Sequence, residues 1–399
     1  MAGPESRGRT DDAEDGGHLD LERTRELFEA STDFTIGLEE EFAIVDPESL
    51  DLRHSFEDLY AACLQDELLA ESAAGELIAS EIEIRSGRAE SFAQAMELQR
   101  EHRARLFVLA EGMDLALAAA GTHPWANYLD QRIIDTPHYA RLRGELRWVA
   151  QRNNTWSLHV HVGVRGADRA VAVCDHLRAV LPALLAASAN SPCLDGRDTG
   201  LHSVRTEIFT RTFPRCGIHQ PFGSWKVYAD FIDLLVRTNS IVEATQLWWS
   251  VRPHHTFGTV ELRICDAQTR GEESFALAAL ITACIAQSAL DYDAGRLPEP
   301  LGQRQIEENL WRAIRYGMDG KMIDFDRGVE TPTPEAVERL LEWTAPARES
   351  LGLEVALPEL NGARRARRAL EGGASIEEVY RVAVAETKRT YLPEGVSTK

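Results

Sequence analysis

Residues 34–45 read FTIGLEEEFAIV, and an Asp-Pro pair that breaks regular structure follows at once. Because residues two apart in a strand share a face, this alternation predicts a strand with one apolar and one polar face. The polar face carries Glu39 and Glu41 among small residues, which pack poorly but leave room for a hydrated divalent cation. Glu40 falls on the apolar face, where a bulge or a partner cation is needed to accommodate its charge.

A second segment, residues 75–87 (GELIASEIEIRSG), also alternates. Its isoleucines share one parity, whereas Glu81 and Glu83 share the other parity with Arg85. Glu76 has the opposite parity to Glu83, so both side chains reach one site only if the backbone bends or bulges between them.

Two later segments predict further strands of the same kind. Residues 156–164 read WSLHVHVGV and residues 256–266 read TFGTVELRICD, so that apolar residues again alternate with polar ones. The parity opposite the apolar residues is occupied by His159, His161, Glu261, Arg263 and Cys265.

Most of the remaining chain has helical periodicity. Helices are expected over residues 21–30, 56–69, 91–120, 139–152, 167–189, 225–237, 273–290 and 303–316, with more in 333–391. Residues 190–223 instead predict a loop-rich segment, and segments of that length inside an enzyme are usually functional. Its positive charges are Arg197, Arg205, Arg211 and Arg215.

Size and composition predict a globular enzyme. The 399 residues are 44% hydrophobic, and no repeat or low-complexity linker divides them. We therefore expect one catalytic domain over residues 21–399 after a disordered acidic tail, residues 1–20. The six scattered cysteines form no C-x-x-C pair, which argues against a disulfide framework or a zinc knuckle and fits a reducing cytoplasm.

Charge narrows the range of partners. With 43 Lys and Arg against 64 Asp and Glu, the net charge is −21, which disfavours a nucleic-acid surface. The N-terminus is polar and no window is expected to reach the roughly 18 apolar residues of a membrane span, so neither a signal peptide nor membrane contact is expected. We expect small-molecule substrates and a cytoplasmic protein, with a homodimer allowed.

Each predicted strand alone could simply turn its polar side chains to water. If all four belong to one curved antiparallel sheet backed by helices, however, their polar faces form a cup of carboxylates and imidazoles with an arginine beside it. Carboxylates held that close destabilise one another unless metal ions lie between them. Within this cup, His161 could equally be a packing residue and Glu81 a surface charge.

These motifs resemble the bacterial carboxylate-amine ligase family, also called glutamate-cysteine ligase type 2. The resemblance runs in order along nearly the whole chain from residue 34, and it implies the α+β glutamine-synthetase-like fold, in which an antiparallel sheet forms an active-site funnel. The motifs are GLEEEF (37–42), LHVHVG (158–163), NSP (190–192), GRDTG (196–200), WSVRP (249–253), GTVELRICD (258–266) and ENLWR (308–312).

The resemblance implies ATP and Mg²⁺ as cofactors and an acyl-phosphate route from glutamate and cysteine to gamma-glutamylcysteine. It places His159 near a metal or a phosphate, with His161 in the same binding region, and Arg263 beside the transferred phosphoryl group. Glu81 departs from the family pattern, which leaves the ligand in that strand open between Glu81 and Glu83. The implied metal ligands are Glu39, Glu41, Glu83 and Glu261, joined by Glu76 if the chain bends.

Other roles follow from the chemistry of such a ligase. Arg205 or Arg211, in the loop-rich segment with Arg197, would clamp the substrate carboxylate as a fork that matches two oxygens. A solvated loop charge is an equal alternative for each of these arginines. Asp266 would accept the proton of the amine. The run Arg364, Arg365, Arg367 and Arg368 is interpreted as an exposed helix face.

Two rival functions stay open. His159 and His161 form an H-x-H pair on a strand, which is a reasonable zinc pair for a hydrolase. A catalytically silent member that binds nucleotide or a partner is the second rival. The sequence lacks the P-loop, Rossmann, zincin and serine-hydrolase motifs, so those classes have no support.

Overall fold

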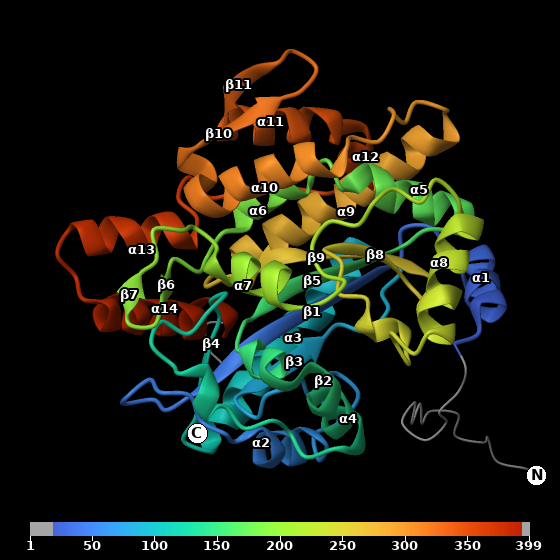
Figure 1. Cartoon of the computed structure of the whole chain (residues 1–399). Coiled ribbons are helices and arrows are strands. Elements are labelled where there is room, and N and C mark those ends of the chain that lie inside the picture. Colours follow the sequence, from blue (N-terminus) through green and yellow to red (C-terminus); the bar gives the residue numbers. More distant parts are fainter. Residues whose placement is uncertain (1–18, 393–399) are drawn as a thin grey trace, which may run out of the picture.

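The computed structural model describes residues 19–392, and its central element is a seven-stranded antiparallel sheet (Figure 1). The strand order is β2-β3-β1-β5-β9-β8, and β4 also pairs with β1. Two small hairpins, β6–β7 and β10–β11, stand apart from this sheet. The strands are β1 (Ile36–Val45), β2 (Ala73–Ala74), β3 (Glu81–Arg85), β4 (Ala116–Ala118), β5 (Ser157–Gly163), β6 (Cys193–Leu194), β7 (Arg197–Asp198), β8 (Val251–His254), β9 (Thr259–Asp266), β10 (Lys321–Asp324) and β11 (Val329–Pro332).

Helices back the apolar face of the sheet. One core cluster joins the sheet to α5, α6, α9 and α10, and a second joins it to α3 and α14. The helices are α1 (Leu21–Ala30), α2 (Phe56–Cys63), α3 (Phe92–Gly112), α4 (Pro137–Leu146), α5 (Ala167–Leu177), α6 (Leu181–Ser188), α7 (Val204–Thr212), α8 (Trp225–Arg237), α9 (Gly271–Asp293), α10 (Gln303–Tyr316), α11 (Thr333–Trp343), α12 (Ala345–Leu351), α13 (Gly362–Glu371) and α14 (Ile376–Tyr391).

Strand register confirms the predicted polar face. Glu41 of β1 lies opposite Glu83 of β3, and Glu39 lies opposite His159 of β5. His161 in turn lies opposite Glu261 of β9. Because facing residues of neighbouring strands project to the same side, the four predicted strands present their charged residues on one surface.

The predicted alternation fails at one point, in β9. Leu158 faces Cys265 whereas Val160 faces Leu262, so β9 carries one extra residue in this interval. As a result Ile264 and Cys265 are both buried in the apolar core, and the placement of Cys265 on the polar face was wrong. A bulge of this kind leaves no mark in the hydrophobic pattern.

Several helix boundaries also differ from expectation. The helix predicted over residues 91–120 ends at Gly112, and Ala116–Ala118 forms β4 against β1. Asp114, with a φ of +57°, marks the turn between them. The loop-rich segment 190–223 contains α7, whose first turn is capped by Ser203. Of the predicted tail, residues 1–18 lie outside the described residues, whereas the Asp20 side chain caps α1.

Helix α9 corrects the expectation that no segment would be long and apolar enough to cross a membrane. Its 23 residues meet that test by length and composition, but 94% of its most apolar window is buried inside the protein. The pair α5 and α6 meets the test only as a unit and is bent by 62°. Burial among the other helices accounts for the composition of α9 as a core helix (Figure 1).

Glu40 is accommodated by a partner cation on the apolar side of the sheet. Arg103 of α3 donates hydrogen bonds to both carboxylate oxygens of Glu40, and both side chains are almost fully buried. Ser274 of α9 donates to the same carboxylate, and Gln99 Nε2 donates to Glu40 Oε2 at 2.8 Å. The Arg103 guanidinium also lies 3.9 Å from the ring centroid of Phe275. This buried ion pair therefore ties β1 to two of the helices behind it.

Candidate active site

Carboxylates and imidazoles from four strands meet on the polar face of the sheet. In three groups, one ligand atom from each member lies within 4.8 Å of the others. Glu39 and Glu83 each belong to two of the groups and so link the three groups into one cluster. The groups are Glu39, His161 and Glu261; Glu39, Glu83 and His159; and Glu41, Glu76 and Glu83.

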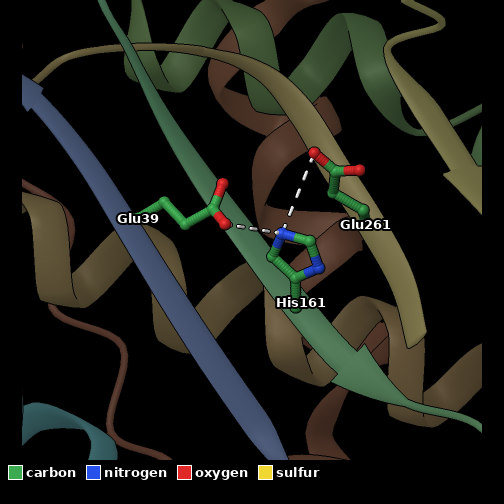
Figure 2. Close-up of side chains that lie close together, drawn as sticks. All are labelled: Glu39, His161 and Glu261. Atoms are coloured by element: carbon green, nitrogen blue, oxygen red, sulfur yellow. Dashed lines mark ion pairs between the residues drawn. The ribbon is translucent and has the colours of Figure 1, made fainter. Parts of the chain in front are cut away.

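His161 bridges two of the acids, as Figure 2 shows. Its Nε2 lies 3.3 Å from Glu39 Oε1 and 3.8 Å from Glu261 Oε1. Burial alone would lower the pKa of His161, but the two carboxylates outweigh it and raise that pKa. Burial would likewise raise the pKa of Glu39, yet the charge of His161 and the hydrogen bond from His159 hold it well below its usual value.

His159 contacts the other side of Glu39. Its Nδ1 lies 3.2 Å from Glu39 Oε2, and its Nε2 lies 2.7 Å from Ser157 Oγ. Ser157 also donates from its backbone N–H to Glu41 Oε2 at 2.5 Å and from its hydroxyl at 2.7 Å. Burial and the nearby charge of Arg263 lower the pKa of His159. Ser157 was missed as a site residue, although it shares the parity of the two histidines.

The chain bend that Glu76 requires is present. Residues 75–80 leave the strand geometry, and Glu76 comes within reach of Glu41 and Glu83. Burial and the charge of Glu41 raise the pKa of Glu76 to about 8, and burial with the charge of Glu39 raises that of Glu83 well above normal. These shifts show that the carboxylates are too crowded to be charged together without a counter-ion.

Glu81 is a buried acid rather than a surface charge. It is only 1% exposed, and its Oε2 has no hydrogen-bond partner among residues 19–392. Burial and the neighbouring carboxylates raise its pKa well above the usual value. Glu83 belongs to two of the three groups and Glu81 to none, so the geometry favours Glu83 as the ligand in this strand.

Two arginines hold Glu261. Arg263 donates to Glu261 Oε1, and Arg252 Nε donates to Glu261 Oε2 at 2.5 Å. Burial would raise the pKa of Glu261, but the two guanidiniums hold it well below normal. Arg252 was missed as a site residue because β8 was not predicted as a strand of its own, although β8 pairs Arg252 directly with Glu261.

The chemistry of these donors fits divalent cations. Carboxylate oxygens are the preferred ligands of Mg²⁺, and three groups of them converge here. His161 Nε2 is buried without a hydrogen-bond partner in the part of the chain that the structure describes. The face holds six buried or half-buried glutamates, which Arg85, Arg252 and Arg263 only partly neutralise. Bound cations would remove the remaining repulsion.

Four other predicted site residues lie differently. Arg205 is buried and donates to the carbonyl oxygens of Ile264 and Arg263, so it braces the bulge of β9 rather than facing a substrate. Asp266 is fully buried and outside the three groups. Its carboxylate accepts hydrogen bonds from Asn190 N, Ser191 Oγ and Ser203 Oγ. These contacts give Asp266 a structural position and argue against its role as proton acceptor.

The remaining two arginines are exposed. Arg211 lies on α7, where its guanidinium is 3.6 Å from Glu207. Arg197 lies on the β6–β7 hairpin, next to Asp198, whose carboxylate contacts Arg367 of α13. Neither belongs to the carboxylate groups. Of the two predicted clamps for a substrate carboxylate, only Arg211 has a solvent-facing guanidinium.

The fold has a counterpart among known structures. The glutamate–cysteine ligase of Francisella tularensis, solved in complex with AMP, matches with a TM-score of 0.66 and 12% identity, over 93% of this chain and 91% of that one. A bifunctional glutathione synthetase from Pasteurella multocida matches with the same score over 94% of this chain and 55% of its own. The predicted α+β glutamine-synthetase-like fold is thus confirmed.

Sequence comparison gives the family. The sequence model of glutamate–cysteine ligase family 2 matches residues 35–385. A putative glutamate–cysteine ligase 2 from Sorangium cellulosum is 40% identical over 89% of this chain and 92% of its own length. One of the same name from Solibacter usitatus is 37% identical over 89% and 93%. The chain belongs to glutamate–cysteine ligase family 2, which confirms the resemblance read from its motifs.

The crowded carboxylates predict a pH-dependent stability in the presence of a chelator. The folded protein keeps the Glu76 proton up to a pKa of about 8, whereas an unfolded chain releases it near 4.5. Between these two pKa values the folded state therefore binds more protons than the unfolded chain. The stabilisation that comes from protonated Glu76 is lost as the pH rises through this range. We expect the melting temperature of the chelated protein to fall across this range, and Mg²⁺ to restore it most at the alkaline end, because metal ligands must be deprotonated.

Scanning calorimetry across this pH series checks the expectation. The variant Glu76→Gln removes the titrating group at nearly constant size and is expected to flatten the slope. A control variant, Glu330→Gln, changes an exposed acid on β11 and is expected to keep it. An equal slope in the wild type and in Glu76→Gln would exclude the assigned proton uptake.

Proposed function

We propose that this protein is an ATP-dependent ligase that joins glutamate to the amino group of cysteine, giving gamma-glutamylcysteine. The observation that carries the proposal is the convergence of three carboxylate groups and Arg263 on one buried sheet face, in a chain of glutamate–cysteine ligase family 2. The nucleotide assignment is supported by the AMP bound to the structural neighbour from Francisella tularensis.

The chemistry requires activation of the acid. A carboxylate does not form an amide readily at neutral pH, because an oxide ion is a very poor leaving group. A carboxylate oxygen of the acid therefore attacks the γ-phosphorus of ATP, and ADP leaves. The amine then attacks the resulting acyl phosphate, the C–N bond forms, and inorganic phosphate leaves with that carboxylate oxygen while the amine loses a proton.

The glutamates of the cluster would hold the magnesium that accompanies the nucleotide. When bound, magnesium neutralises phosphate charge and aligns the transferred group. The residues assigned to this task are Glu39, Glu41, Glu76, Glu83 and Glu261.

Arg263 would stabilise the phosphoryl group as it moves. Its Nε is buried and has no hydrogen-bond partner among the described residues, so the guanidinium retains a free donor. Glu261 fixes the orientation of this guanidinium through its Nη1 atom. Ser157 and Glu39 hold the ring of His159 in the same region, where it would lie near the metal or a phosphate.

The geometry disfavours the zinc hydrolase. His159 and His161 belong to different groups, on either side of Glu39, so the two imidazoles do not form one ligand set. Each group is instead dominated by carboxylate oxygens, which suit magnesium better than zinc.

An ADP-release assay tests the proposed function. We expect release that requires glutamate, Mg²⁺ and an amine together, with cysteine giving the highest rate in a panel of amino acids. ADP release of the same rate without any amine would contradict ligation, and activity restored by zinc alone would favour the hydrolase. A wider panel of acids and amines also shows whether the family name describes the true substrates.

A further inference from the structure

A second polar cavity lies away from the sheet. Its volume is about 370 Å³, and it is bordered by α13, the end of α10 and the loop before α7. In Figure 1, α13 lies at the edge of the molecule beside the β6–β7 hairpin. None of the residues lining this cavity belongs to the strands of the central sheet, so the cavity is separate from the carboxylate cluster.

Arginines dominate the lining. Among the described residues, four arginines line the cavity, whereas only two carboxylates do, those of Asp319 and Glu371. The net charge of the whole chain is −21. His202 is also part of the lining, and burial with the nearby charge of Arg367 lowers its pKa to about 4. The four arginines are Arg315, Arg364, Arg367 and Arg368.

The interpretation of this arginine run as an exposed helix face holds only for Arg368. The side chains of Arg364 and Arg367 are only 21% and 19% exposed. Arg365, on the same helix, is 19% exposed and binds Glu273 of α9 instead of lining this cavity. Helix α13 therefore turns Arg364 and Arg367 toward this space, whereas Arg368 borders it from an exposed position.

Structural contacts account for part of this cluster. Arg364 Nε lies 2.9 Å from Asp319 Oδ1, and Arg315 donates to the carbonyl oxygen of Gly200. Arg367 donates to Asp198 Oδ1 at 3.1 Å and to the carbonyl oxygen of Leu201 at 2.9 Å. These bonds fix the guanidiniums in place and leave other N–H donors available, since each guanidinium carries five.

Arg368 and Arg367 have N–H donors that no residue in the described part of the protein accepts. Arg368 makes no ion pair or side-chain hydrogen bond with any residue between positions 19 and 392. Arg367 Nε is buried and likewise lacks a hydrogen-bond partner in that range. A buried donor without an acceptor is costly, so an anionic ligand would stabilise this site.

We propose that this cavity binds a small phosphate-bearing anion, held by Arg364, Arg367 and Arg368. Guanidinium forks match the oxygen geometry of phosphate and can bind it through two parallel hydrogen bonds. The volume suits a ligand of the size of a diphosphate group and lies within the range of small-molecule sites. The proposal is independent of the reaction assigned to the carboxylate cluster.

Isothermal titration with inorganic pyrophosphate tests this site. The full chain is kept in a chelator, because the metal-free carboxylate cluster repels phosphate and reports no binding of its own. We expect saturable binding that Arg368→Gln weakens by about 10- to 100-fold, the usual effect of losing a hydrogen bond to a charged group. Titration with ADP in parallel shows whether a free or a nucleotide-borne phosphate binds better; loss of affinity in Arg368→Gln is expected for both.

Two further variants separate binding from structural effects. Glu371→Gln removes a negative charge from the cavity and is expected to tighten pyrophosphate binding, which damage to the fold would not do. Arg304→Gln changes an exposed arginine at the start of α10 and is expected to leave binding unchanged. Absence of saturable binding to the wild type, or equal affinity in the wild type and Arg368→Gln, would overturn the proposal.

Discussion

Replacing Glu261 with glutamine is expected to lower the rate of ATP-dependent amide formation by about 100- to 1,000-fold, the usual cost of losing one preorganised electrostatic partner. Glu261 organises the charges of the site, because Arg252, Arg263 and His161 all contact its carboxylate. Glutamine keeps the size of the side chain but removes the charge that holds Arg263 in place. The rate is measured as ADP release with saturating glutamate, cysteine and Mg²⁺.

The matched control is Glu330→Gln, which makes the same chemical change at an exposed position on β11. It is expected to retain the wild-type rate. Both variants are compared by circular dichroism, because burial of Glu261 means that its substitution could also alter folding. A folded Glu261→Gln with undiminished ADP release would show that the carboxylate cluster is not the catalytic centre, as a catalytically silent member would require.

Replacing Arg103 with methionine is expected to lower the free energy of unfolding by about 3–5 kcal/mol, the usual cost of leaving one member of a buried ion pair without its partner. Arg103 is 2% exposed, and methionine fills much of its volume without supplying a charge. Glu40 then keeps the hydrogen bonds from Gln99, Ser274 and Tyr391 but has no opposite charge beside it. Urea denaturation measures the loss.

Arg105→Met on the same helix is the control for this effect. Arg105 pairs with Asp66, but its side chain is 47% exposed, so the expected loss is below about 1 kcal/mol. Adding Glu40→Leu to Arg103→Met removes the unpaired charge and is expected to recover part of the lost stability. Equal losses in the two single variants would show that the Glu40–Arg103 pair does not tie β1 to its helices.

The polar face of the sheet was predictable because strand side chains alternate with a fixed period of two. That period placed Glu39, Glu41, His159, His161 and Glu261 on one surface without knowledge of the pairing, and the register confirms it. Two further signals came from local breaks in the pattern. Glu76 required a bend before β3, and Glu40 required a cation, and both requirements are met.

Long-range partners were not predictable from the pattern. Arg103 lies 63 residues from Glu40 in sequence, and nothing in α3 distinguishes it from the exposed arginines beside it. Arg205 and Asp266 have residue types suited to catalysis, but tertiary hydrogen bonds engage both in supporting the end of β9. The short strand β4 was hidden in an apolar run that also suits a helix, and only its pairing with β1 decides its structure.

The central claim is that this chain activates a carboxylate by phosphorylation on its carboxylate-lined sheet face. Glutamate labelled with ¹⁸O in its side-chain carboxylate tests it most directly, with cysteine, ATP and Mg²⁺ present and the inorganic phosphate analysed by mass spectrometry. Our account predicts one ¹⁸O atom in each phosphate released, because the attacking carboxylate oxygen leaves with the phosphoryl group. Phosphate that forms together with product yet carries no label would contradict it.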